Sequence, residues 1–264
     1  MSDDLNKHQL QQDPWQQLKA FTNARIAIGR VGSSLPTKEI LDFGLSHAMA
    51  RDAVHLALDV AALESELQLL GLNTIQVHSQ APDRATYLLR PDWGRRLDEP
   101  SLTLLQNAKT HAPIDLLIVV GDGLSSLAVS RHVIPLLAEC QKILPTKWFA
   151  NQVIIASQAR VAIGDEIGQA LNARMVVMLI GERPGLSSPD SLGIYITYNP
   201  KLGLSDAARN CISNVRPEGL QYAAAAKKLV WLAKEAMRLQ LTGVNLKDES
   251  DVQEIGYESA QLLT

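Results

Sequence analysis

The sequence predicts an α/β protein, in which a mainly helical N-terminal region precedes a Rossmann-like, mostly parallel sheet with helices on both faces. Beyond residue 113, short and almost continuously apolar runs alternate with helical segments, which is typical of parallel strands buried on both faces. Before that point the apolar residues follow mostly helical spacing. We therefore expect a helical region over residues 1–112, a Rossmann-like domain over residues 113–246 and a polar tail over residues 247–264.

The N-terminal region is expected to contain several helices and one strand. Asp13 and Pro14 predict a helix start, because Asp can cap a helix and Pro is tolerated at the first helical position; this helix is expected to end near Asn23. A longer helical pattern covers Lys38–Leu70 and ends at Gly71, a typical capping residue. The remaining elements are a strand at Leu72–His78 and helices at Asp83–Arg90 and Ser101–Thr110, on either side of a turn at Pro91–Gly94.

The Rossmann-like domain is expected to alternate strands with helices. The predicted strands are Ile114–Val120, Gln152–Ala156, Met175–Ile180 and Gly193–Tyr198. The predicted helices are Leu124–Leu137, Ile163–Leu171 and Leu220–Leu241, with a helical turn beginning at Ser205. Such an order predicts a sheet covered on both faces.

The composition argues against several classes of protein. A net charge of −3 and an aromatic content of 5% give no basic patch or stacking platform for nucleic acid. The polar N-terminus does not resemble a secretory signal, and no apolar run approaches the roughly 18 residues of a membrane helix. Cys140 and Cys211 form neither a disulfide framework nor a metal motif, so we expect a cytoplasmic protein.

Four predicted loops carry the residues that most suggest a ligand. They are GDGLSS (Gly121–Ser126), SQARV (Ser157–Val161), GERPG (Gly181–Gly185) and RNCISN (Arg209–Asn214). Ligands of open α/β sheets bind outside the carboxyl ends of the strands. If each loop follows a strand of one sheet, all four meet at that edge, and the sequence predicts a ligand site there.

Gly121-Asp122-Gly123 leaves two interpretations open. Glycines between a strand and a helix allow close approach of a phosphate, but they also suit a tight turn. A dinucleotide fingerprint would need Gly or Ala where Ser126 stands, and an acidic residue at the end of the next strand, where Ala156 and Ser157 stand instead. A stand-alone nucleotide-binding oxidoreductase that uses this loop remains the alternative function, and a non-catalytic assembly protein is a third.

Two further groups of residues have a functional and a structural interpretation. His47, Arg51, His55 and Asp59 recur every four residues and would form one polar stripe on a long helix, either a metal or catalytic site or a face toward solvent or a partner. We favour the latter. Glu182 could pair with Arg183 at the surface or bind a ligand at the strand end, and Cys211 has no neighbouring histidine to activate it as a nucleophile.

Long motifs in the chain resemble one family. RIAIGRVGSSLPTKEILDFGLSHAMARDAVH near the N-terminus, then SQARVAIGDEIG, LIGERPGL and RNCISNVRPEG, are similar in the same order to the small subunit of ethanolamine ammonia-lyase. The resemblance covers roughly Pro14 to Asn245. The segment before Pro14 shows no clear amphipathic stripe of the kind that targets proteins to a microcompartment, and the tail from Lys247 extends past the usual family end.

The resemblance implies a function that the pattern of elements alone does not show. It implies an adenosylcobalamin-dependent lyase of ethanolamine catabolism, which converts ethanolamine to acetaldehyde and ammonia by radical chemistry that begins at the cobalt–carbon bond. The chain would be a small subunit, active only with the large subunit in a hetero-oligomer, and located in a bacterial microcompartment. The family's cobalamin contacts fall on Val161, Glu182 and Cys211, with no catalytic or metal-binding residue in this chain. The chain lacks a D-x-H-x-x-G motif, which fits a cofactor that keeps its own lower axial base.

Overall fold

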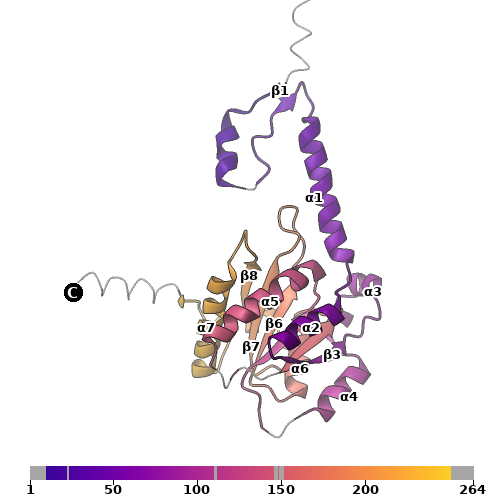
Figure 1. Cartoon of the computed structure of the whole chain (residues 1–264), viewed down its shortest axis with the longest axis vertical. Coiled ribbons are helices and arrows are strands. Elements are labelled where there is room, and N and C mark those ends of the chain that lie inside the picture. The colour runs from indigo at the N-terminus through magenta and orange to yellow at the C-terminus, as the bar shows by residue number, and fades with distance from the viewer. Residues whose placement is uncertain (1–9, 23, 110–111, 146–147, 149–151, 251–264) are drawn as a thin grey trace, which may run out of the picture.

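A six-stranded mixed sheet forms the centre of the molecule (Figure 1). The computed structural model describes residues 10–22, 24–109, 112–145, 148 and 152–250. The strands are β3 (Asn73–His78), β4 (Leu117–Gly121), β5 (Gln152–Ser157), β6 (Met175–Gly181), β7 (Leu192–Tyr198) and β8 (Asn210–Val215). Their order is β3-β5-β4-β6-β7-β8, with the first four parallel and the last two antiparallel to their neighbours.

Helices cover both faces of this sheet. One apolar core joins the sheet to α2 (Val60–Leu69), α5 (Ser126–Ile143) and α7 (Tyr222–Leu239). A second core on the other face joins it to α4 (Glu99–Asn107) and α6 (Ile163–Ala170). The central strands β4 and β6 are buried over their whole length, as expected of parallel strands between two helical layers. The predicted fold class is confirmed.

Short helical elements lie in the connections between the longer ones. They are α3 (Arg84–Leu89), η3 (Trp93–Arg95) and η5 (Asp206–Ala208). No helix among the described residues is long and apolar enough to cross a bilayer.

The predicted helix over Lys38–Leu70 is wrong in one respect, because the structure divides it into α1 (Thr37–His55) and α2. Leu56 leaves the helical conformation, and the Asp59 carboxylate accepts a hydrogen bond of 3.0 Å from the backbone N–H of Ala62. Asp59 therefore caps a new helix and does not continue the old one. The predicted end at Gly71 is confirmed: its φ of +77° lies in the left-handed region, and its N–H donates to the Gln68 carbonyl.

The prediction of RNCISN as a loop is also wrong, because most of it forms β8. Polar residues on its exposed face obscured the strand pattern, whereas Ile212 and Val215 are buried in the core shared with α7. Among the described strands, β8 lies at the edge of the sheet and pairs with β7 alone. Only its last residues reach the edge at which β6 ends, since Val215 pairs with Leu192 and Leu192 pairs with Gly181.

Residues 10–55 project from the core (Figure 1). This segment, here called the arm, consists of β1 (Leu10–Gln11), the 3-10 helix η2 (Pro14–Phe21), β2 (Arg30–Val31) and α1. Asp13 caps η2 as predicted, accepting from the Trp15 N–H at 2.9 Å, but η2 ends at Phe21, and Asn23, its predicted end, is outside the described residues.

The predicted domain limits remain predictions. Residues 110 and 111, beside the predicted boundary, and residues 251–264 of the predicted tail lie outside the described part of the chain. Of the predicted N-terminal region, β3 pairs with β5 in the central sheet, and α2 and α4 pack on that sheet.

Candidate functional site: a pocket at the carboxyl edge of the sheet

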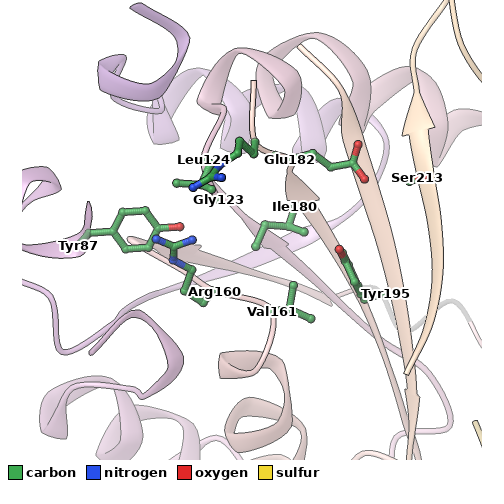
Figure 2. A pocket seen from close by; sticks show the side chains of 11 residues that line it. Tyr87, Gly123, Leu124, Arg160, Val161, Ile180, Glu182, Tyr195 and Ser213 are labelled. Carbon is green, nitrogen blue, oxygen red and sulfur yellow. The ribbon is translucent and has the colours of Figure 1, made fainter. Parts of the chain in front are cut away.

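An open cavity of about 510 Å³ lies at the carboxyl ends of β4, β5 and β6 (Figure 2). Its volume falls within the range of small-molecule sites. After β4 the chain enters α5 on one face, and after β5 it enters α6 on the other, which is the switch point where α/β sheets bind ligands. The lining residues are Tyr87, Gly123, Leu124, Arg160, Val161, Ile180, Gly181, Glu182, Arg183, Tyr195 and Ser213.

The loop after β4 is a tight turn packed against β6. Gly123 has a φ of +58°, and a Cβ atom there would lie 2.2 Å from the Gly181 carbonyl oxygen. The next residue, Leu124, donates its N–H to that same oxygen at 2.9 Å. The first turn of α5 is capped internally, since the Ser125 hydroxyl accepts from the Ala128 N–H at 3.2 Å. The glycine is therefore explained by close packing, which favours the structural interpretation of this loop.

Asp122 joins the loop after β4 to the loop after β5. Its carboxylate is buried and accepts from the N–H groups of Gln158 and Ala159 at 3.0 and 2.9 Å. Arg84 of α3 lies 3.4 Å from the same carboxylate and donates to the Gly123 carbonyl at 2.8 Å. Burial raises the pKa of Asp122, while the backbone donors and Arg84 act in the opposite direction. The acidic residue of the GDG motif thus holds two pocket loops together.

Tyr87 supports Arg160 at one side of the pocket (Figure 2). The Arg160 guanidinium lies 4.5 Å from the Tyr87 ring centroid, and the Tyr87 hydroxyl donates to the Ala159 carbonyl at 2.9 Å. Among the described residues, the buried Nε atom of Arg160 has no hydrogen-bond partner. Arg160 also lines the cavity, so an oriented cation stands at this side of the pocket, beside Val161.

Glu182 holds the outer strands and still faces the pocket. Its Oε2 atom accepts from the Ser191 hydroxyl and, at 3.2 Å, from the N–H of Asn214 at the end of β8. No donor to its Oε1 atom is seen in the described part of the chain. Glu182 and Arg183 both line the cavity, and no ion pair between them is found in the residues described. The prediction of a simple surface pair is thus not supported.

Val161 and Cys211 lie differently with respect to the cavity. Val161 lines it, in the turn just before α6. Cys211 is an exposed residue of β8 beside Tyr195 and does not line it, although Ser213, two residues on and on the same strand face, does. Although the residue as a whole is exposed, partial desolvation of its thiol raises the pKa of Cys211, so the thiol stays protonated, which argues against a nucleophile.

Other predicted residues have structural positions. Arg209, the first residue of RNCISN, is buried and donates to the Asp165 carboxylate at 2.5 Å, away from the pocket lining. His47, Arg51 and His55 are exposed on α1, whereas Asp59 caps α2 and does not extend their stripe. The described residues contain no group of three or more metal-ligating side chains.

Comparison with known proteins gives the chain a family. The model of the ethanolamine ammonia-lyase light chain family matches residues 12–247. The chain belongs to this family. It is 57% identical over 251 residues to the ethanolamine ammonia-lyase small subunit of Pseudomonas fluorescens Pf0-1, with 94% of this chain and 92% of the relative covered. The corresponding subunit of Pseudomonas aeruginosa LESB58 is 54% identical over the same shares of the two chains.

Family membership decides between the functions that the sequence left open. The chain is the small subunit of an adenosylcobalamin-dependent lyase, the partner of a large subunit in a heteromer. The stand-alone oxidoreductase that would use Gly121-Asp122-Gly123 is therefore wrong, as is the assembly protein without an enzymatic role. The structure agrees, since that loop is packed against Gly181.

Sequence reasoning missed three residues of the pocket. Tyr87 lies in a predicted helix with no motif around it, and Tyr195 lies in mid-strand. Arg160 stood within a motif but was not singled out. Period-two alternation places Tyr195 and Cys211 on neighbouring strands of one face, yet the register that brings them together follows from β8, which the sequence did not predict as a strand.

Proposed function

We propose that the pocket at the carboxyl edge holds one side of adenosylcobalamin, with Val161, Glu182 and Cys211 among its contacts, while the large subunit holds the rest of the cofactor and the substrate. One observation carries this proposal: Val161 and Glu182, which the family resemblance assigns to the cofactor, come from different loops and line one cavity. Cys211 adjoins that cavity through Tyr195.

The chemistry of the pocket fits part of a corrin and its amide arms. Adenosylcobalamin is larger than a drug-sized ligand, and an open cavity of about 510 Å³ suits an edge of it. Val161 and Ile180 offer apolar contact. The guanidinium of Arg160, which lines the cavity, can donate to amide or phosphate oxygens, and the free Oε1 of Glu182 can accept from an amide nitrogen.

This chain's own contribution is to bind, orient and shield. When bound, adenosylcobalamin supplies the radical that converts ethanolamine to acetaldehyde and ammonia. Asp122 fixes the two loops that present Gly123 and Val161, and Glu182 fixes the end of β8 against the loop after β6. A pocket preorganised in this way keeps the cofactor in one orientation against the partner and keeps water from one side of it.

Titration of adenosylcobalamin into the reconstituted two-subunit complex, followed by corrin absorbance, tests the proposal. A charge-assisted hydrogen bond contributes about 1.5–3 kcal/mol, so Glu182→Ala should weaken cofactor binding roughly tenfold or more. Glu182→Gln keeps one acceptor and should lie between Ala and wild type. Glu218→Ala, a substitution outside the pocket lining, is the control and should bind as wild type does. Equal affinity of wild type and Glu182→Ala would remove Glu182 from the cofactor site.

We also propose a cytoplasmic location, in the microcompartment that family membership implies. Cys140 and Cys211 are both free thiols, which suits a reducing compartment. A fluorescent fusion of this chain, expressed with and without the microcompartment shell, tests the proposal. Puncta that need the shell are expected, and diffuse fluorescence in both strains would contradict it.

A further inference from the structure

The arm exposes an unusual concentration of large apolar side chains. Of the twenty such side chains that are exposed among the described residues, eleven lie between Leu10 and Met49. In the described part of the arm only Pro36 and Ala53 are buried. Large apolar patches of this kind mark interaction sites on soluble proteins. The arm is therefore as rich in large apolar side chains as a buried segment, yet this chain leaves most of those side chains exposed.

Helix α1 is apolar on two opposite sides. Leu41, Leu45 and Met49 follow each other at intervals of four and form a line along one side, while Ile40 and Phe43 lie on the other. A helix that is apolar around much of its circumference is typical of a helix buried among other elements. At 19 residues α1 is about 28 Å long, which is sufficient to span a wide contact.

The N-terminal part of the arm folds back toward α1 without covering it. Lys19 of η2 donates to Glu39 at 3.3 Å, and the Arg25 guanidinium lies 5.3 Å from the Phe43 ring centroid. Trp15 and Phe21 on η2 remain 66% and 86% exposed, and Phe43 remains 48% exposed. The arm's own contacts thus leave these apolar side chains open to a second molecule.

Arg84 connects the base of the arm to the pocket by hydrogen bonds. Arg84 donates through Nε to the Val54 carbonyl near the end of α1, at 2.7 Å. The same guanidinium donates through Nη1 to the carbonyl of Gly123, which lines the pocket. A partner that closes the pocket over the cofactor is therefore adjacent to the root of α1.

We propose that the arm docks on the large subunit, which covers the apolar side chains of α1 and η2 in the assembled enzyme. The family supplies this partner, and Arg84 links the base of the arm to the pocket at the carboxyl edge. The inference rests on the proposed function in so far as the large subunit covers that pocket. The arm then stabilises the association of the two subunits whether or not the cofactor is bound. A second copy of this chain is the competing occupant of the same surface.

Measurement of subunit affinity without cofactor tests the proposal. The double substitution Leu41→Gln, Leu45→Gln keeps good helix formers, and both leucines are over 60% exposed in the chain, so its own stability should not change. Because the large subunit would bury both leucines in the complex, their replacement should weaken binding to the large subunit about a hundredfold. The matched control is Leu69→Gln, Leu89→Gln, two leucines that are 89% and 80% exposed outside the arm, and its affinity should stay within twofold of wild type.

Two outcomes would overturn the proposal. One is an unchanged affinity of the arm variant for the large subunit. The other is a wild-type chain that self-associates through the arm, with self-association lost in the variant and subunit affinity kept, which would assign the surface to a second copy. A photoreactive benzoylphenylalanine at Phe43 gives an independent readout. It should crosslink to the large subunit in the complex, and crosslinks solely to this chain would also overturn the proposal.

Discussion

Replacement of Asp122 should disturb the pocket at the carboxyl edge, although Asp122 is not among the residues that line it. Its buried carboxylate receives two backbone N–H groups of the loop after β5 and faces Arg84. Asp122→Asn preserves the shape, but an amide can present only one acceptor atom, so one backbone N–H and the Arg84 charge lose their partner. Removing one member of a buried ion pair costs about 3–5 kcal/mol, and the separation of 3.4 Å to Arg84 favours the lower end.

A loss of about 3 kcal/mol is large against the roughly 5–15 kcal/mol that keeps a typical domain folded. Urea unfolding of the full chain, followed by circular dichroism, measures it through the shift of the midpoint. The matched control is Asp83→Asn at the exposed N-cap of α3, where Asn caps about as well as Asp and the expected change is below about 0.5 kcal/mol. Equal stabilities of Asp122→Asn and wild type would refute the assignment of Asp122 as the link between the two loops.

Three further outcomes are expected. Burial lowers the pKa of His132, so its neutral form is favoured in the folded chain. The free energy of unfolding should therefore be at its full value above about pH 6.5 and should fall by at most about 1.4 kcal/mol per pH unit below it. In urea titrations at pH 5–8, His132→Gln should reduce this dependence, whereas the control His55→Gln, at an exposed residue, should not. Cys140 is buried, which raises its pKa to about 12, whereas Cys211 is exposed, so iodoacetamide should label Cys211 first in the native chain. Peptide mass spectrometry measures the labelling, and equal labelling of both thiols would contradict the fold around α5. Gly123→Ala should destabilise the chain by more than about 1 kcal/mol, since its Cβ would meet the Gly181 carbonyl, whereas Gly44→Ala on α1, with open space around it, should be neutral or stabilising in the same unfolding assay.

The sheet could be predicted because its strands obey the simplest pattern. β4 and β6 are apolar throughout, since helices cover both of their faces, and such runs are visible without any long-range information. The carboxyl-edge loops followed from this, and the pocket lies among three of them. By contrast, β8 has one exposed face on an edge strand, so its polar residues hid it.

The break after α1 and the arm could not be predicted for a different reason. Helical periodicity continues in sequence from Leu45 through Leu67, and nothing local tells which apolar residues meet this chain's core and which stay exposed on the arm. The links through Asp122 and Arg84 join loops distant in sequence, so they depend on the packed structure. Family resemblance identified Val161, Glu182 and Cys211 but gave no indication of Tyr87 or Arg160, which the fold places beside them.

The central claim, that this chain holds one side of the cofactor at the carboxyl edge of its sheet, is tested most directly by hydrogen–deuterium exchange on the two-subunit complex with and without adenosylcobalamin. Peptides that cover residues 157–162, 181–184 and 211–214 should exchange more slowly when the cofactor is bound. Peptides that cover the opposite ends of the strands, such as residues 199–204, should not change. Protection confined to the large subunit, with no change in those three segments of this chain, would contradict the account.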